Sequence, residues 1–381
     1  MADHETPYTH LPPEKFWRSG VAQKHITQLE NVYTKKFDIA AEDRISTQGS
    51  CFAQHVARYM KEAGYNIIDM EPPLPGMTDE TAKKFGYSVY SARYGNIYSV
   101  RQWLQLFDDA REQAVREEDV FERDGRYYDG LRPAVEPYGL GSKEEVIEHR
   151  KKHLENVRRL FRFTDVYVFT LGLTECWVNR ESGTVYPICP GVIAGTFDPE
   201  KYEFRNFRYE EVYRDFVMLR RKIKRMNENA RFLITTSPVP LTATATDKHI
   251  LVASSHTKSV LRAVAGGLYD EFDDVDYFPG YEMATTHTAR GFYYNPNQRT
   301  ISPDGVALVM KAFLDQHRPI TAKPSDDERA AQIAARRAAR GLPPLEGRAG
   351  AATAGKAAGR SGGAGEEELV CEEIMLEAFA K

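Results

Sequence analysis

Residues 44–60 read RISTQGSCFAQHVARYM, and their pattern changes at Gly49-Ser50. The stretch before this turn, Arg44-Ile45-Ser46-Thr47, is typical of a short strand. After the turn, small and apolar side chains recur at three- and four-residue spacing, which indicates a helix. These side chains are Phe52, Ala53, Val56, Ala57 and Met60. A strand that passes directly into a helix is the repeating unit of an α/β fold.

The same alternation continues through most of the chain. Residues 165–171 (DVYVFTL) form a nearly continuous apolar run, as expected for a parallel strand that is buried on both faces. Ser142 and Glu145 form a capping box for one helix, and Ser302-Pro303 opens the last helix. Further strands are predicted at 65–68, 231–236 and 275–278, and helices at 100–114, 142–161, 209–227, 254–265 and 302–317. We therefore predict an α/β protein, a three-layer α/β/α sandwich with a mainly parallel sheet, whose functional residues follow the carboxyl ends of the strands.

Four segments are predicted along the chain. Residues 1–40 form an N-terminal arm, and residues 41–318 form the α/β domain, with an insertion near 101–141. Residues 319–365 are dominated by Ala, Gly and Arg, and such a composition buries too little apolar surface to offset the entropy of ordering the chain, so we expect disorder. Residues 366–381 are expected to form a short acidic segment.

The composition argues against several classes of protein. A formal net charge of −4 provides no basic excess for a nucleic-acid partner. The 4 cysteines form no CxxC pair, and neither zinc motifs nor phosphate-binding loops occur, so no metal and no cofactor are expected. Neither a long apolar run nor an apolar leader is present, which predicts no membrane span and a cytoplasmic protein with free thiols. The oligomeric state stays open.

The turn at Gly49-Ser50 offers a candidate nucleophile. A side chain there projects from a tight turn, and the first helical N–H groups can stabilise a developing oxyanion. In the alternative interpretation Ser50 only caps the helix, which is a common use of serine. Cys51 is a rival nucleophile, since a thiol at a helix N-terminus has a lowered pKa, unless it is simply a small buried hydrophobic residue.

Several blocks in one order resemble the GSCFA family, which takes its name from residues 49–53 as they stand here. The other blocks are 16–21 (FWRSGV), 92–98 (ARYGNIY), 170–177 (TLGLTECW), 237–241 (SPVPL) and 277–282 (YFPGYE). The resemblance covers roughly residues 10–316. That family is similar to the wider SGNH/GDSL hydrolases, in which the serine of a Gly-Asp-Ser turn attacks an ester.

The resemblance implies a serine esterase or an O-acyltransferase that acts on an ester-linked acyl group of a small molecule or carbohydrate. Ser50 would be the nucleophile, and Gly95 and Asn96 would supply space and donors for the oxyanion. Thr174 stands where the wider superfamily has an asparagine, so its hydroxyl would be a shorter third donor.

The general base is where this sequence departs from the superfamily. The usual Asp-x-x-His before the last helix is replaced by residues 297–300 (NQRT). His287, in the loop after the last strand, is the preferred substitute, and His249 is the second candidate. Glu175 could orient a histidine or pair with Arg93. The missing base also leaves open a catalytically inactive binding protein on the same scaffold.

Overall fold

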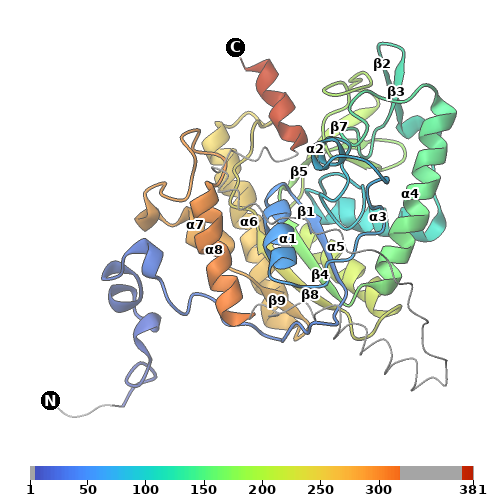
Figure 1. Cartoon of the computed structure of the whole chain (residues 1–381). Helices are drawn as coiled ribbons and strands as arrows, with labels where there is room; N and C mark the ends of the chain where they lie inside the picture. Colours follow the sequence, from blue (N-terminus) through green and yellow to red (C-terminus); the bar gives the residue numbers. More distant parts are fainter. Residues whose placement is uncertain (1–4, 318–370, 381) are drawn as a thin grey trace, which may run out of the picture.

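The computed structural model of the chain describes residues 5–317 and 371–380. Its centre is a four-stranded sheet in the order β1-β4-β8-β9 (Figure 1). The strands are β1 (Ile45–Gly49), β4 (Val166–Leu171), β8 (Arg231–Thr236) and β9 (Val275–Tyr277). Each neighbouring pair is parallel. The predicted α/β class with a mainly parallel sheet is therefore confirmed.

The outer edge of β1 carries one further contact. Ile67 forms a parallel bridge with Ile45, and the amide of Ile68 donates to the Ile45 carbonyl at 3.0 Å. The strand predicted at 65–68 is thus reduced to a single bridge. With that bridge included, the order of the chain across the sheet reverses between β1 and β4. In open α/β sheets, ligands bind at such a reversal point.

Helices cover both faces of the sheet. One face carries α3 (Val100–Glu112), α4 (Lys143–Phe163), α5 (Tyr209–Lys224) and α6 (Ile250–Glu271). The other face carries α1 (Phe52–Glu62), α7 (Gly280–Thr285) and α8 (Pro303–Gln316). On the first face Trp103 stacks on Phe169 of β4, with ring centroids 4.3 Å apart. Burial of each such large side chain stabilises the fold by about 1.5–3 kcal/mol.

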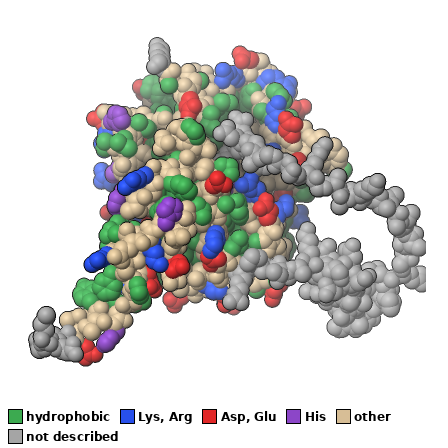
Figure 2. Space-filling view, turned by 60° about the vertical axis from the view of Figure 1, so that its left-hand side comes forward, with side chains coloured by type: hydrophobic (Ala, Val, Ile, Leu, Met, Phe, Trp, Pro, Cys, Tyr) green, Lys and Arg blue, Asp and Glu red, His purple; other side chains and the backbone are tan. Residues whose placement is uncertain are grey.

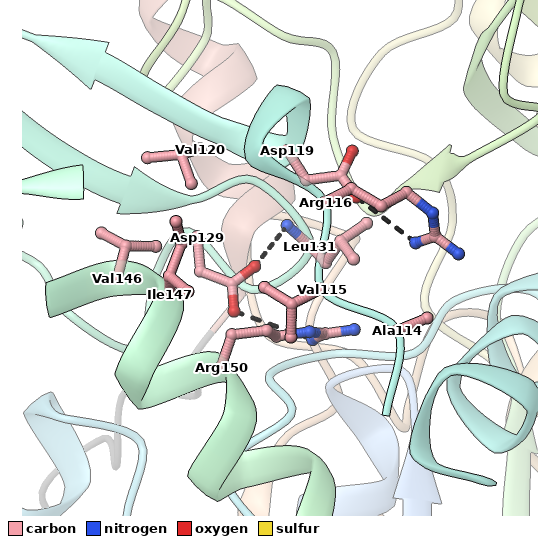
Figure 3. Close-up of a pocket in the computed structure, with 10 residues that line it drawn as sticks. All are labelled: Ala114, Val115, Arg116, Asp119, Val120, Asp129, Leu131, Val146, Ile147 and Arg150. Carbon is pink, nitrogen blue, oxygen red and sulfur yellow. Dashed lines mark hydrogen bonds and ion pairs between the residues drawn. The ribbon is translucent and has the colours of Figure 1, made fainter. Parts of the chain in front are cut away.

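The predicted insertion near 101–141 contains α3, the short helix η4 (Glu117–Asp119) and a hairpin of β2 (Val120–Arg123) and β3 (Arg126–Asp129). Buried charges attach this region to α4. Figure 3 shows Arg150 of α4 directed toward Asp129, 3.7 Å away, and Arg150 also contacts Asp109 at 3.1 Å. The cavity between them is about 10 Å³, roughly the space for one water molecule. These charges pair with one another and position the hairpin.

A second, antiparallel sheet has the order β6-β5-β7 and was not predicted. Its strands are β5 (Glu175–Asn179), β6 (Val185–Tyr186) and β7 (Tyr202–Asn206). It follows β4 directly, so it lies at the carboxyl end of the parallel sheet. One more short helix, α2 (Asp79–Lys84), lies near this end in Figure 1.

The two ends of the chain differ in their packing. The N-terminal arm contains η1 (Pro13–Lys15), η2 (Arg18–Ala22) and η3 (Ile26–Gln28), and it projects from the body in Figure 2. The C-terminal helix η6 (Glu372–Phe379), red in Figure 1, lies instead at the carboxyl ends of the strands. The stretch at 319–365, predicted to be disordered, lies outside the described residues. Across 5–317 and 371–380, every helix is too short or too polar to cross a membrane.

Candidate functional site

Ser50 lies in the turn between β1 and α1. Its amide donates to the Thr170 carbonyl at 3.2 Å, and Gly49 has a φ of +137°. Ser50 is 3% exposed, and its Oγ forms no hydrogen bond with any residue in the described part of the chain. The N-cap position of α1 belongs to Cys51, so the interpretation of Ser50 as a helix cap is wrong. An unpaired buried hydroxyl costs about 1–3 kcal/mol, which is a cost typical of a functional position.

Backbone hydrogen bonds join three of the sequence blocks around this turn. The amide of Ile97 donates to the Gly49 carbonyl at 2.9 Å, and the amide of Gly172 donates to the Tyr98 carbonyl at 3.0 Å. A Cβ on Gly172 would lie 2.9 Å from the Cβ of Ser50. The structure therefore brings Ser50 together with residues 95–98 and with the end of β4, at the reversal point of the sheet.

The second block presents hydrogen-bond donors to a carboxylate. The backbone N of Asn96 lies 3.5 Å from Glu372 Oε1, and its side-chain Nδ2 donates to Glu372 Oε2. The hydroxyl of Tyr98 donates to the same Oε2 at 2.9 Å. A Cβ on Gly95, whose φ is +70°, would lie 3.1 Å from Glu372 Oε1, so the glycine leaves room for this carboxylate.

Neighbouring side chains fix the orientation of Asn96. The hydroxyl of Tyr90 lies within hydrogen-bond distance of Asn96 Oδ1 and, at 3.1 Å, of the Ser50 carbonyl. The side chain of Gln102 donates to the Asn96 carbonyl at 3.0 Å. Burial raises the pKa of Tyr90, so its hydroxyl stays neutral and able to donate. With Oδ1 engaged by Tyr90, the amide nitrogen of Asn96 is the group directed at the carboxylate.

Two positive side chains lie close to a second carboxylate. Arg299 contacts Glu373 at 3.4 Å, and Lys258 donates to the Gly172 carbonyl at 2.8 Å. Burial lowers the pKa of Lys258 to about 8, while the negative charge of Glu373 acts in the opposite direction. Burial likewise raises the pKa of Glu373, and Arg299 and Lys258 oppose that shift. The site thus combines neutral donors and cations.

The thiol of Cys51 has properties opposite to those expected of a nucleophile at a helix N-terminus. A hydrogen bond to Cys371, together with burial, raises the pKa of Cys51 well above its usual range. The same hydrogen bond lowers the pKa of Cys371. A thiolate nucleophile requires a lowered pKa. While Cys371 lies against it, Cys51 is therefore held as a neutral thiol.

The two candidate histidines lie on the surface. His287 is exposed and stacks on Trp17 of the N-terminal arm, with ring centroids 5.6 Å apart. His249 is also exposed, and its Nδ1 accepts a hydrogen bond from the Leu251 amide as the N-cap of α6. Since Ser50 Oγ has no partner within the described ranges, the structure does not bring either imidazole into contact with it.

Thr174 is buried beside the end of β4, but its hydroxyl is engaged elsewhere. It donates to Asn206 Oδ1 at 2.6 Å and lies 2.9 Å from the hydroxyl of Thr257. These contacts tie β7 and α6 to the end of β4. To act as an oxyanion donor, Thr174 would have to give up one of these hydrogen bonds.

Glu175 and Arg93 do not pair with each other. Glu175 begins β5 and accepts hydrogen bonds from the Thr244 hydroxyl at 2.9 and 3.0 Å. Burial raises the pKa of Glu175. Arg93 contacts Glu136 at 2.7 Å and so fixes the loop that follows the β2–β3 hairpin.

Several residues of the site were missed by the sequence analysis. Tyr98 and Arg299 lay within stretches that were quoted, but no role was given to them. Lys258 and Thr257 are both buried on α6, but two adjacent polar residues on a predicted helix do not by themselves indicate burial. Glu372 and Glu373 lay in the predicted acidic segment, where no local pattern indicated contact with residues near Ser50.

An apolar cavity of about 300 Å³ adjoins the cluster. It opens between the antiparallel sheet, the loop after β8 and η6, and Glu175 and Glu373 supply carboxylates to its lining. Its larger apolar lining residues are Leu173, Trp177, Ile188, Phe204, Leu376 and Phe379. This volume is at the lower end of the range of small-molecule pockets. Among residues 5–317 and 371–380, no cluster of three or more His, Cys, Asp or Glu could hold a metal ion.

Three comparisons with known proteins differ in what they show. One crystal structure is similar over 42% of this chain and 68% of its own, at 16% identity and a TM-score of 0.24, which is too low to inform on the fold. No curated protein matches the chain. The model of the GSCFA family matches residues 44–313, more than half of the chain and the part that carries the site around Ser50. The chain therefore belongs to the GSCFA family.

Proposed function

We propose that this protein is a serine esterase or O-acyltransferase with Ser50 as its nucleophile. The observation that supports this most directly is the carboxylate of Glu372, which is bound by Asn96 and Tyr98. The Tyr90 hydroxyl links this Asn96 to the carbonyl of Ser50, whose own hydroxyl is unpaired within the described residues. An oxyanion that forms from an ester carbonyl needs the same kind of donors as a carboxylate oxygen.

The proposed reaction has two steps. Ser50 Oγ attacks the ester carbonyl carbon, and the carbonyl oxygen becomes an oxyanion that accepts hydrogen bonds from Asn96 and Tyr98 in the space beside Gly95. Collapse of this intermediate expels the alcohol and leaves the acyl group on Ser50. Water or a sugar hydroxyl then attacks the acyl carbon, and Ser50 is regenerated.

We propose Lys258 as the group that accepts the Ser50 proton. It is buried, it hydrogen-bonds the carbonyl of Gly172, and Gly172 packs against Ser50. A pKa of about 8 leaves a useful neutral fraction of the amine near neutral pH. Ser50 Oγ contacts none of the three candidates within the described residues. Lys258 would have to turn from the Gly172 carbonyl, whereas His287 and His249, which remain alternatives, would have to move toward Ser50 from exposed loops.

The adjoining apolar cavity suits the acyl group of the substrate. Its walls begin at Leu173, the residue that follows Gly172 at the end of β4. The volume of about 300 Å³ is measured with η6 in place, and the walls from the antiparallel sheet and the loop after β8 are the part available to a short or medium acyl chain once η6 is displaced. An acyl ester of a carbohydrate is the substrate class that the family's resemblance to SGNH/GDSL hydrolases suggests.

Covalent labelling tests the nucleophile. We expect a fluorophosphonate probe to modify Ser50, and the label to disappear in Ser50→Ala. Ser46→Ala is the matched control, because Ser46 is a buried serine of β1, the strand that leads into the Ser50 turn, and its hydroxyl is also unpaired within the described residues. Loss of label in both variants would indicate a folding defect. Label that persists in Ser50→Ala would refute the proposed nucleophile.

A second set of variants tests the base. Lys258→Met is expected to lower kcat for p-nitrophenyl esters by about 10²–10⁴-fold, the usual contribution of general base catalysis. His287→Ala and His249→Ala are expected to retain activity within a few-fold. The reverse pattern would transfer the role to the histidine whose loss removes activity.

A catalytically inactive binding protein is the second candidate. It is favoured by the lack of contact between Ser50 and either histidine in the described part of the chain. Absence of both labelling and ester hydrolysis across acyl lengths, in a protein whose η6 has been displaced, would support this candidate.

A further inference from the structure

The C-terminal segment occupies the site that the proposed mechanism requires to be open. Glu372 is 2% exposed and Glu373 is 6% exposed, although both carry carboxylates close to the end of the chain. A buried carboxylate that is not paired is strongly unfavourable. The contacts of these two side chains therefore identify the chemistry of the surface beneath them.

Among the described residues, the donors to the first carboxylate are all neutral. Glu372 accepts hydrogen bonds from the Asn96 side chain and the Tyr98 hydroxyl, and its Oε1 fills the space above Gly95. Those are the groups assigned above to the oxyanion. An ester carbonyl cannot be bound there while Glu372 is present.

The second carboxylate is held by positive charge. Arg299 contacts Glu373 at 3.4 Å, and Lys258 lies near enough to affect its pKa. Lys258 makes a single hydrogen bond, to Gly172, within the described ranges, and the Nε of Arg299 has no partner there. Both cations therefore retain donors for an anionic ligand.

The preceding residue reinforces the placement. Cys371 hydrogen-bonds Cys51, the residue that follows Ser50, and its Sγ lies 3.8 Å from the Tyr98 hydroxyl. Three successive residues of the segment thus contact the turn, the oxyanion donors and the cations. The remainder of η6 places Leu376 and Phe379 on the apolar cavity.

We propose that this site binds two neighbouring carboxylates, one at Asn96 and Tyr98 and one at Arg299 and Lys258, and that residues 371–373 are its resident ligand. The inference rests on the proposed function, since it assigns the same donors, and it adds both a substrate preference and a control. Arg299 favours substrates that carry an anionic group beside the ester, whereas Lys258 must be neutral when it accepts the Ser50 proton. The segment must leave before such a substrate reaches Ser50.

The first test compares the rate at which a fluorophosphonate labels Ser50 in full-length variants. Glu372→Gln combined with Glu373→Gln removes both charges without changing side-chain shape, and labelling is expected to accelerate about tenfold or more, because hydrogen bonds to charged groups are the stronger class. Glu377→Gln is the matched control, since it removes the same charge from an exposed position of η6. Equal rates in the double variant and in the wild type would overturn the proposal.

A second readout does not depend on catalysis. In a Ser50→Ala background, alkylation of Cys51, which is 3% exposed under the segment, is expected to accelerate in the same double variant. If Ser50 never labels but Cys51 becomes reactive, the proposed esterase function fails while the resident ligand stands. If Cys51 is equally protected in both chains, the resident ligand is refuted.

The cation subsite is tested in trans. A synthetic peptide of residues 371–380 added to the double variant is expected to slow alkylation of Cys51 again, and a peptide with glutamine at 372 and 373 is expected to have no effect. Arg299→Gln should weaken protection by the peptide, whereas Arg290→Gln, a change at an exposed arginine, should not. Equal protection by both peptides would refute recognition of the carboxylates.

Discussion

Substitution of Gly49 by alanine tests how tightly the Ser50 turn packs on the sheet. A Cβ there would lie 2.6 Å from the carbonyl oxygen and 2.7 Å from the amide nitrogen of Thr170, and both are backbone atoms of β4. Neither atom can move without breaking the β1–β4 pairing at Gly49 and Thr170. Overpacking of this kind costs about 1–3 kcal/mol. The φ of +137° costs an alanine about 1–3 kcal/mol more, so the expected total loss is about 2–6 kcal/mol.

Gly125→Ala is the matched control for this measurement. Gly125 lies in the β2–β3 turn with a φ of +73° and no atom within 4 Å of a built Cβ, so its substitution costs only about 1–2 kcal/mol of backbone strain. Both variants gain the same unfolded-state term from replacing glycine, which cancels in the comparison. Urea unfolding followed by circular dichroism gives both free energies. Equal losses in the two variants would contradict the close packing of the turn on Thr170.

Three further predictions concern the site, the pH dependence and the core. Asn96→Ala should lower kcat for ester hydrolysis by about 10²–10³-fold, since one oxyanion donor is lost, and should cost about 1–3 kcal/mol in the free energy of unfolding, because the buried Tyr90 hydroxyl and Glu372 carboxylate lose a partner; unchanged kcat would remove Asn96 from the site. Burial lowers the pKa of His55 to about 4, so below about pH 6.5 the unfolded chain binds a proton that the folded protein does not. The free energy of unfolding is therefore expected to fall by up to about 3 kcal/mol as the pH is lowered from above 6.5 to 4. Urea titrations at pH 7 and 4 on the wild type and His55→Gln measure this, and an equal decline in both would refute it. Trp103→Ala should cost about 3–5 kcal/mol, because it removes a buried side chain and leaves a cavity beside Phe169, and a loss below 1 kcal/mol in thermal unfolding would contradict the packing.

The parallel sheet could be predicted because its signal is local. Residues 166–169 and 232–234 are continuous apolar runs, as expected for strands buried on both faces. The antiparallel sheet was missed because β5 and β7 each have only 5 residues. These two strands pair although β6 and its loops separate them in the sequence. Pairings between short, distant strands leave no periodicity in either segment.

The candidate site was predictable only in part, for a similar reason. Ser50, Gly95 and Asn96 lie within blocks whose order resembles a known family, and the structure brings these blocks together. Lys258 and Arg299 act through their position relative to a turn far away in the sequence. Spacing along one helix or loop cannot reveal such a relation. His287 and His249 were chosen because each lies in a loop that follows a strand, but both are exposed on the surface. A loop after a strand need not turn toward the strand ends.

Because η6 belongs to the same chain as Ser50, dilution of the protein does not release η6 from the site, and a free ligand must compete with a tethered one. A tethered ligand binds in a unimolecular step, so the fraction of occupied sites does not depend on protein concentration. The effective concentration of a tethered ligand is on the order of millimolar for short linkers and falls as the linker lengthens. A free competitor of equal affinity must therefore be present above that effective concentration to displace the tethered segment. A partner that captures the exposed side of η6, where Met375 is 55% exposed, would open the site without touching any group that contacts the substrate.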